Sequence, residues 1–482
     1  MSEVAELLVP AIRWDSARGY DGSRSFIDKA LELGVGGFIL FGGEQEAVRA
    51  LTKELRTRSR LPLLIGADLE RGAGQQFAGA TGLPPLAAIA ALDDADAVRR
   101  AARLTAREAR TMGVNWDFAP VCDLDVLPDN PIVGTRSLGA DPRRVGALAA
   151  EWIDACQSEG VIACAKHFPG HGRTPTDSHV GLPVVTLSKR ELLDTDIVPF
   201  RSAIEAGVAS VMTAHVAYPA LDPSGAPATM SRDILVWLLR QQLKFDGLVV
   251  TDALIMEGAK AADDGEAAVR ALNAGCDVLL YPRDLQATER GLTQALKDGA
   301  LDVERVHQAR RRRLKWAQWA SPPNEYRKPS VADAAWGAQL ADRVVHLVRG
   351  RLPRLTAPVD VIVVDDDVGG PYPPPSREPF LTALSAAGLD ARRAESPSRD
   401  GRHSTVIALF GDVRAWKARP GFSNASRAAV ERACETDRNA VVVQFSHPRL
   451  AREISGCPIV VCAWGGETAM QQAAARFLVR GG

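Results

Sequence analysis

Residues 162–183 read IACAKHFPGHGRTPTDSHVGLP, an apolar run that turns at once into a polar loop. The first four residues are typical of a buried β-strand, and the glycines and prolines that follow break regular structure. The loop carries three of the chain's eight histidines, His167, His171 and His179, and His215 follows a later strand-like run. A cluster of this kind at a strand end is more typical of a functional site than of scattered surface or core histidines.

The alternation of strand and helix extends over about the first 310 residues. Strand-like runs lie at 7–12, 37–41, 61–68, 114–120, 162–165, 209–216, 247–252 and 276–281, with amphipathic helical stretches between them. Alternating strands and helices predict a parallel sheet, and eight such units predict a (β/α)8 TIM-type barrel. An open doubly wound sheet is the alternative fold.

Two observations favour the barrel over the open sheet. No GxGxxG opens a helix after the first strand, as a dinucleotide-binding sheet would require. Polar residues also stand at the ends of many different strands, namely Asp68, Asp117, Lys166, His215 and Asp252. A barrel gathers all of these ends in one ring, where such enzymes have their active sites.

The remainder of the chain shows a second, smaller pattern. Prolines and polar residues mark a linker at 321–335, so we expect the barrel to comprise residues 1–320. Strand-like runs at 359–364, 405–410, 440–445 and 458–463 alternate with helical stretches, the first of which is predicted at 331–347. Residues 336–482 are therefore predicted to form a C-terminal α/β sandwich domain.

Composition narrows the class of protein. The 482 residues are 46% hydrophobic and 24% charged, with a net charge of −1, which is ordinary for a soluble enzyme and gives no reason to expect a nucleic-acid partner. The basic run at 310–315 follows apolar residues at helical spacing and is interpreted as the solvated end of a helix.

The cysteines and the N-terminus indicate the cellular compartment in which the protein is expected. Seven cysteines without CxxC spacing indicate buried thiols in a reducing compartment, and neither a disulfide framework nor a zinc site. The N-terminus has acidic residues where a signal peptide needs basic ones, and no apolar run approaches 18 residues. We therefore expect a cytoplasmic protein with no membrane partner; the oligomeric state stays open.

The sequence KHFPGHG at 166–172, followed by DSH at 177–179, resembles the signature of glycoside hydrolase family 3, specifically its β-N-acetylglucosaminidase branch. The resemblance extends over residues 1 to about 320 and continues more weakly beyond. It implies a barrel followed by an α/β sandwich, a carbohydrate as the small-molecule substrate, and a retaining mechanism without metal or cofactor.

The resemblance also implies the catalytic groups. A retaining glycosidase needs a carboxylate nucleophile and a proton donor. Asp252, which ends an apolar strand and opens TDALIMEG at 251–258, matches the family's nucleophile. His179 matches the acid/base of this branch and Asp177 its orienting partner, which suits an imidazole that titrates near neutral pH. The alternatives are that Asp252 caps the next helix and that Asp177 shapes a turn.

A sugar must also be held through its hydroxyl groups. The predicted substrate-binding residues are Asp68, Arg136, Lys166 and His167, which match the family pattern, with Arg71 and His215 as weaker candidates. Asp68 is followed by Leu69-Glu70-Arg71-Gly72, where the family commonly shows Gln-Glu-Gly-Gly-Arg. This departure removes no catalytic group but makes the identity of the sugar less secure than the class of reaction.

The resulting hypothesis is a retaining β-N-acetylhexosaminidase that removes terminal β-linked N-acetylglucosamine, for example from peptidoglycan fragments. A glycoside phosphorylase is an alternative, because a neutral imidazole does not repel phosphate as a carboxylate would. A β-glucosidase and a non-catalytic sugar-binding protein are further alternatives. A metal-dependent hydrolase is disfavoured, since the chain lacks HxH and HExxH spacing.

Overall fold

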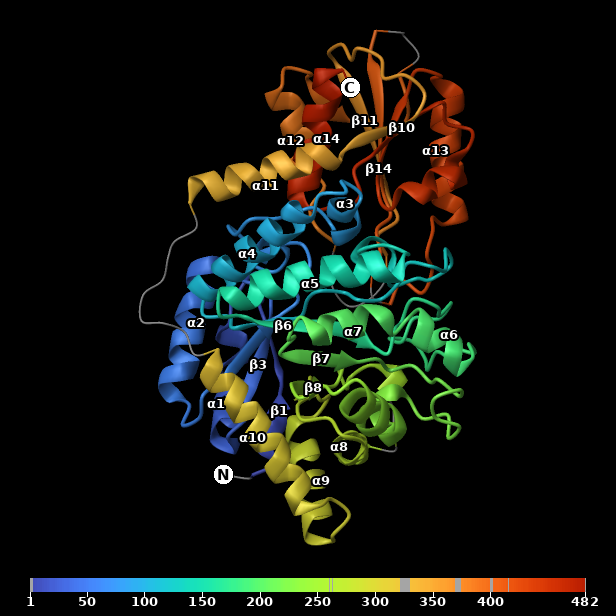
Figure 1. The fold of residues 1–482 in the computed structure, drawn as a ribbon. Helices are drawn as coiled ribbons and strands as arrows, with labels where there is room; N and C mark the ends of the chain where they lie inside the picture. Colours follow the sequence, from blue (N-terminus) through green and yellow to red (C-terminus); the bar gives the residue numbers. More distant parts are fainter. Residues whose placement is uncertain are drawn as a thin grey trace. The chain divides into compact units, whose positions relative to one another are not determined.

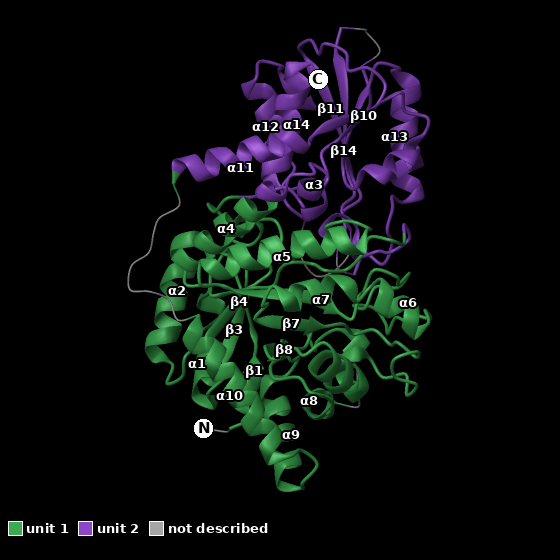
Figure 2. Cartoon of the chain, viewed as in Figure 1, with its two compact units in different colours: residues 1–81, 98–127, 137–330 green, residues 82–97, 128–136, 331–482 purple. Residues whose placement is uncertain are grey.

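The computed structural model describes residues 3–259, 261, 263–320, 330–368, 374–398, 402–414 and 416–481 (Figure 1). The chain forms two compact units (Figure 2). Unit 1 comprises Met1–Thr81, Val98–Leu127 and Ser137–Ser330, and unit 2 comprises Gly82–Ala97, Pro128–Arg136 and Val331–Gly482. Most of the predicted linker at 321–335 lies outside the described residues. The domain boundaries expected from the sequence, 1–320 and 336–482, remain a prediction.

The strands of unit 1 form a ring of parallel neighbours. Their bounds are β1 (Leu8–Val9), β2 (Ala11–Arg13), β3 (Gly37–Phe41), β4 (Leu64–Ala67), β5 (Trp116–Asp117), β6 (Ile162–Phe168), β7 (Ser210–Thr213), β8 (Leu248–Val250) and β9 (Leu279–Leu280). Strands β2 to β8 pair in chain order, and β1 pairs with β9. A bridge between Val250 and Val278 joins β8 to the segment that enters β9. Because only Pro10 separates β1 from β2, the ring closes.

Helices follow the strands and surround the ring (Figure 1). Those of unit 1 are α1 (Arg24–Leu33), α2 (Gln45–Arg58), α5 (Pro142–Ser158), α6 (Lys189–Asp194), α7 (Val198–Glu205), α8 (Asp264–Ala274), α9 (Leu285–Lys297) and α10 (Val303–Trp319), while α4 (Ala95–Thr111) belongs to both units. A π-helical segment, Asp233–Gln242, lies between β7 and β8. The predicted barrel is thereby confirmed. Among the described residues, no helix has both the length and the apolar composition that a membrane crossing requires.

Side chains from alternate strand positions fill the barrel. The cluster includes Ile39, Leu64, Trp116, Phe118, Ile162, Met212, Leu248 and Leu280. Gly66 on β4 has to be a glycine here, because a Cβ atom would lie 2.5 Å from the ring of Phe118. The barrel is therefore a packed core, and chemistry is confined to the ends of its strands.

The interpretation of the basic run at 310–315 as a solvated helix end is only partly correct, because Arg311 and Lys315 are exposed but the run does not end its helix. The run does lie in a helix, α10, but Arg313 is fully buried and donates hydrogen bonds to two backbone carbonyls of the barrel, at 3.3 and 2.9 Å. Arg310 pairs with Glu6 at 2.8 Å. These arginines point inward because buried carbonyls and carboxylates near the N-terminal segment need donors.

Unit 2 is an α/β sandwich, as predicted. Its strands are β10 (His346–Arg349), β11 (Val359–Asp365), β12 (Ala391–Arg393), β13 (Ser404–Phe410), β14 (Val441–Phe445) and β15 (Ile459–Cys462), and its helices are α3 (Leu86–Ala90), α11 (Val331–Val344), α12 (Glu378–Ala386), α13 (Asn424–Thr436) and α14 (Thr468–Arg480). The order is β10-β15-β14-β13-β11-β12, parallel except for β10. One hydrophobic cluster packs α12 and α14 against one face of this sheet, and another packs α13 against the opposite face.

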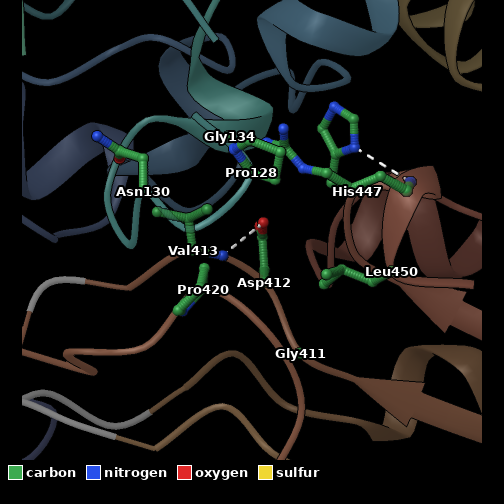
Figure 3. Close-up of a pocket in the computed structure, with 10 residues that line it drawn as sticks. Pro128, Asn130, Gly134, Gly411, Asp412, Val413, Pro420, His447 and Leu450 are labelled. Carbon is green, nitrogen blue, oxygen red and sulfur yellow. Dashed lines mark hydrogen bonds between the residues drawn. The ribbon is translucent and has the colours of Figure 1, made fainter. Parts of the chain in front are cut away.

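The segment Pro128–Arg136 lines a pocket of unit 2 together with the loops that follow β13 and β14 (Figure 3). Asn130 and Gly134 belong to this segment, and Asp412, Val413 and His447 belong to the loops. The loops at the carboxyl ends of β13 and β14 therefore adjoin a short segment that lies, in the sequence, between two stretches of unit 1.

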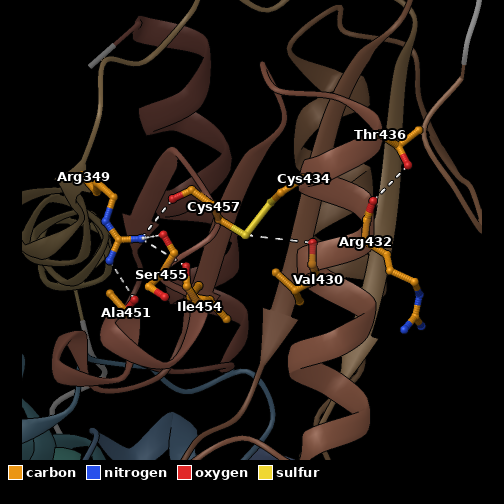
Figure 4. Close-up of a disulfide and its surroundings, with 9 residues drawn as sticks. All are labelled: Arg349, Val430, Arg432, Cys434, Thr436, Ala451, Ile454, Ser455 and Cys457. Carbon is orange, nitrogen blue, oxygen red and sulfur yellow. Dashed lines mark hydrogen bonds between the residues drawn. A yellow bond between two sulfur atoms is a disulfide. The ribbon is translucent and has the colours of Figure 1, made fainter.

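The expectation that all cysteines are thiols is wrong for one pair. Cys434 on α13 and Cys457, which precedes β15, form a disulfide with Cα atoms 5.4 Å apart (Figure 4). The two cysteines are 23 positions apart in the sequence, and the fold brings the helix and the loop together, which the spacing in the sequence did not reveal. The five other cysteines are buried free thiols.

Candidate active site

Five of the predicted site residues lie at the carboxyl ends of four strands of the ring. Asp68 follows β4, Lys166 and His167 stand at the end of β6, His215 follows β7, and Asp252 follows β8. The register between β6 and β7 shifts between Ala165 and Phe168, so the Lys166-His167 pair occupies an irregular part of the ladder. Such irregularities re-aim side chains at the rim of a barrel.

Lys166 is the centre of an ion-pair cluster. Its side chain is only 1% exposed, and its Nζ lies 2.6 Å from Asp68 Oδ1 and 2.7 Å from Glu70 Oε1. The Asp68 side chain is 31% exposed, so this carboxylate remains accessible to solvent. The buried Lys166 ammonium holds it in place. The sequence analysis did not single out Glu70, although this residue lies within the stretch after Asp68 that departs from the family pattern.

Asp117 lies beneath this cluster at the end of β5. Its Oδ1 accepts a hydrogen bond from the Leu69 amide at 3.3 Å. Burial raises the pKa of Asp117 well above its usual range, although the Lys166 ammonium acts in the opposite direction. Its position supports the loop that begins at Asp68.

His167 and His171 share one buried carboxylate, Asp123, which sequence reasoning missed. His167 Nδ1 lies 2.6 Å from Asp123 Oδ2, and the His171 amide donates to Oδ1 at 2.6 Å. Burial opposes ionisation of Asp123, but His167 and His171 offset this and lower its pKa. The sequence did contain one indication of this role, because Asp123 is an acidic residue among the apolar residues Val121, Cys122 and Leu124.

His171 holds the following loop from inside. It is 1% exposed, its Nδ1 lies 2.8 Å from Thr174 Oγ1, and its Nε2 lies 2.9 Å from Ser178 Oγ. Burial lowers the pKa of His171 to about 4. His171 is therefore neutral in the folded protein at ordinary pH, and its two ring nitrogens fix the loop that carries Asp177 and His179.

Acidification is expected to destabilise unit 1 through His171. In the unfolded chain the imidazole titrates at ~6.5, so between that pH and about 4 the unfolded state binds a proton that the folded state does not. The contribution of neutral His171 to the free energy of unfolding is complete above the pKa of the unfolded chain. It falls by up to about 3 kcal/mol as the pH drops to the pKa of His171 in the folded protein. Guanidinium unfolding at about pH 7 and about pH 4.5 would measure this slope. His171→Gln should unfold more easily at the higher pH but lose less on acidification, and equal slopes for both proteins would contradict the assignment.

The loop after β6 presents Asp177 and His179 as a hydrogen-bonded pair. His179 Nδ1 lies 2.7 Å from Asp177 Oδ1, which also accepts the His179 amide at 2.9 Å. Asp177 is 1% exposed, whereas the His179 side chain is 15% exposed. Because Nδ1 faces the carboxylate, Nε2 is the ring nitrogen that could exchange a proton with a bound molecule.

The same loop is tied to the turn that carries Asp252. The Gly258 amide donates to Ser178 O at 3.0 Å, and a Cβ on Gly258 would lie 2.9 Å from the backbone oxygen and Cβ of His215. This close approach requires a glycine, because a side chain would separate the segments. His179 and Asp252 are thus brought into one electrostatic environment.

Asp252 sits at the start of this turn, partly buried. Its Oδ1 accepts the Ala253 amide at 2.8 Å, and His215 Nε2 donates to Ala253 O at 3.2 Å. Burial favours the neutral acid, but His167, His215 and His179 together with the Ala253 amide outweigh it and lower the pKa of Asp252. The carboxylate is therefore ionised, as a nucleophile must be.

The remaining predicted residues have different surroundings. His215 is fully buried, with Nδ1 2.8 Å from Thr229 Oγ1, so it supports the Asp252 turn. Arg71, a weaker substrate-binding candidate, is buried, with 7% of its surface exposed. Arg136 belongs to unit 2, where its backbone and side chain bond to Val133 and Ile132. The catalytic and binding roles of all nine predicted residues remain predictions.

A closed ring of parallel strands whose carboxyl edge gathers a buried lysine, histidines and ionised carboxylates defines a (β/α)8 enzyme. Residues 3–315 match the family model described as the glycosyl hydrolase family 3 N terminal domain. The chain belongs to glycosyl hydrolase family 3, which confirms the resemblance seen in the sequence.

Individual relatives agree with this assignment. The chain is 36% identical over 416 residues to a β-N-acetylglucosaminidase/β-glucosidase of Cellulomonas fimi, an alignment that covers 78% of this chain and 74% of that protein. It is 42% identical over 257 residues to a β-hexosaminidase of Thiobacillus denitrificans, covering 51% and 71%. The structure of a family 3 β-N-acetylglucosaminidase from Paenibacillus sp. strain FPU-7 superposes with a TM-score of 0.86 at 28% identity, covering 99% of this chain and 96% of that one.

Proposed function

We propose that this protein is a retaining β-N-acetylhexosaminidase that removes terminal β-linked N-acetylglucosamine, with cell-wall fragments as a source of substrate. The observation that carries the mechanism is the arrangement at the barrel rim, where three imidazoles lower the pKa of Asp252 and one of them, His179, is bonded to Asp177. The names of the relatives support the choice of sugar. A cytoplasmic location, expected from the sequence, stays a prediction.

In the first step Asp252 attacks the anomeric carbon from the face opposite the leaving group. A bond forms between a carboxylate oxygen and that carbon while the glycosidic carbon–oxygen bond breaks. His179 gives the proton on Nε2 to the departing oxygen, so the aglycone leaves as a neutral alcohol. The Asp177 carboxylate fixes the orientation of the ring through Nδ1, so the transferred proton is the one on Nε2.

In the second step water replaces the aglycone. Neutral His179 removes a proton from the water as its oxygen bonds to the anomeric carbon, and the bond to Asp252 breaks. The carboxylate is released and the sugar keeps its original anomeric configuration. The accessible carboxylate of Asp68, held by buried Lys166, accepts hydrogen bonds from sugar hydroxyls during both steps.

The test compares hydrolysis of an aryl β-N-acetylglucosaminide with that of the matching aryl β-glucoside, with and without inorganic phosphate. Preference for the acetamido sugar with the same rate in both buffers is the expected result. Comparable rates on both sugars would indicate a β-glucosidase. Phosphate-dependent appearance of sugar 1-phosphate would instead identify a phosphorylase, and no turnover with measurable sugar binding would identify a binding protein.

A further inference from the structure

The turn that carries Asp252 is docked on the end of the neighbouring strand, β9. The Leu254 amide donates to the Leu280 carbonyl at 3.0 Å, and the Ile255 amide donates to the Tyr281 carbonyl at 3.1 Å. Both strands, β8 and β9, belong to unit 1. The two carbonyls at the end of β9 therefore fix the backbone that immediately follows the predicted nucleophile.

Tyr281 has an unusual backbone conformation for its residue type. Its φ is +46°, in the left-handed region that glycine adopts freely and a tyrosine adopts only under strain. Residues held in this region cluster at functional sites, where surrounding contacts over-determine the geometry. Because φ sets the direction of the carbonyl relative to the amide, a relaxed Tyr281 would aim its carbonyl away from Ile255. The strain is therefore tied to the position of the Asp252 turn.

Contacts of both the backbone and the side chain hold Tyr281 in this conformation. Its amide donates to the Val9 carbonyl at 2.9 Å, where β1 and β9 close the ring. Its hydroxyl accepts a hydrogen bond from Arg13 Nε at 3.1 Å, and the Arg13 guanidinium lies 4.0 Å from the centre of the Phe41 ring. The Phe41 and Tyr281 rings pack against the core that fills the barrel. A strained residue persists only with support of this kind.

We propose that Tyr281 is a positioning residue for Asp252, because its left-handed backbone directs a carbonyl to the Asp252 turn and Arg13 maintains that backbone through the phenol. This proposal rests on the proposed function, in which Asp252 is the nucleophile. A nucleophile reacts only when its oxygen lies close to the anomeric carbon and in line with the bond that breaks. A small displacement of the turn therefore lowers the rate of attack more than it weakens substrate binding.

The experiment uses the difference between glycine and alanine at a positive φ, in the full-length protein. Tyr281→Gly and Tyr281→Ala both lose the ring, so both should lower kcat on the aryl N-acetylglucosaminide. Glycine keeps the left-handed backbone without strain, whereas alanine relaxes and turns the carbonyl away. Tyr281→Gly should therefore retain roughly fivefold more kcat than Tyr281→Ala, which reverses the usual order of these substitutions in a strand. KM should change by no more than about twofold in either variant.

A milder variant tests the contribution of Arg13. Tyr281→Phe keeps the ring and removes only the hydroxyl that Arg13 Nε contacts, so kcat should fall by about threefold with little change in KM. This variant preserves the packing of the ring on the barrel core, and it decides the matter if the smaller side chains prevent folding. An unchanged kcat for Tyr281→Phe would overturn the role given to Arg13.

Lys244 offers a matched control elsewhere in unit 1. Its φ is +57°, and it is exposed. It precedes β8, so it lies at the amino-terminal end of the strand whose carboxyl end leads to Asp252. Lys244→Gly should unfold at a higher temperature than Lys244→Ala, because glycine fits a positive φ, while kcat should be the same in both. The control thus separates the effect of backbone strain on stability from its effect on catalysis.

Trapping with a fluorinated N-acetylglucosaminyl fluoride, which leaves a stable glycosyl-enzyme, separates this proposal from the proposed function. Mass spectrometry of the wild-type adduct identifies the residue that carries the sugar, and the rate of trapping measures attack by that residue. We expect an adduct on Asp252 that forms more slowly in Tyr281→Ala than in Tyr281→Gly. Equal trapping rates in the two variants, or a larger change in KM than in kcat, would overturn the positioning role. An adduct on another residue would refute the proposed nucleophile itself.

Discussion

Replacing Asp252 with Asn is expected to lower kcat on the aryl N-acetylglucosaminide by about 10⁴-fold or more, because the amide cannot form the glycosyl ester. Its lowered pKa means that the wild-type group is ionised across the working range. The amide keeps the size of the side chain, so the unfolding temperature should change little. Steady-state kinetics and thermal unfolding of the same preparation measure both quantities.

Asp277 provides the matched control for this substitution. It is fully buried and pairs with Arg240 and Arg305, both at 2.6 Å, and with Arg312 at 3.2 Å. Breaking a buried ion-pair network costs about 3–5 kcal/mol, so Asp277→Asn should lower the unfolding temperature clearly. An Asp252→Asn protein that retains a few per cent of kcat would contradict the assignment of the nucleophile.

Replacing His179 with Ala is expected to have an effect that depends on the leaving group. Glycosides with poor leaving groups, such as a second sugar, need the proton, and their kcat/KM should fall by about 10²- to 10⁴-fold. A dinitrophenolate leaves without protonation, so its release in the first step should be nearly unaffected. A plot of kcat/KM against leaving-group acidity should therefore be much steeper for the variant than for the wild type.

Two comparisons sharpen the reading of that plot. Asp177→Asn should fall between the wild type and His179→Ala, since it removes the negative charge beside Nδ1 but keeps a hydrogen-bonding partner for the ring. His307→Ala on α10, where the imidazole is 40% exposed, should behave like the wild type. Equal losses with all leaving groups would show that His179 acts in binding or folding, and not as the acid/base.

The barrel could be predicted from the sequence because its strands are buried on both faces and read as apolar runs between amphipathic helices. The predictions were least accurate where tertiary contacts override local pattern. The helix predicted to reach Leu347 ends at Val344, whose carbonyl accepts Trp464 Nε1 at 3.0 Å, and His346–Arg349 instead pairs with β15. No local signal in the sequence reports a partner more than 100 residues away.

The residues of the candidate site also divide into those that the local sequence pattern could predict and those that tertiary contacts decide. Asp68, His179 and Asp252 could be proposed because they stand at strand ends or in a loop with a recognisable spacing. Glu70 and Asp123 could not, because their importance lies in the partners they meet, Lys166 and His167, which only the folded ring brings to them. Arg313 shows the converse, since one arginine of a basic run that looks solvated is buried against backbone carbonyls.

The composition of unit 2 from three separate stretches has a consequence for anyone who wishes to dissect this protein. A fragment that ends at Ser330 would carry Gly82–Ala97 and Pro128–Arg136 without the sheet that they pack on. A fragment that begins at Val331 would lack Ala88, which lies in the same core cluster as Phe380 and Met470. A single cut at either boundary would therefore separate segments that pack together in unit 2.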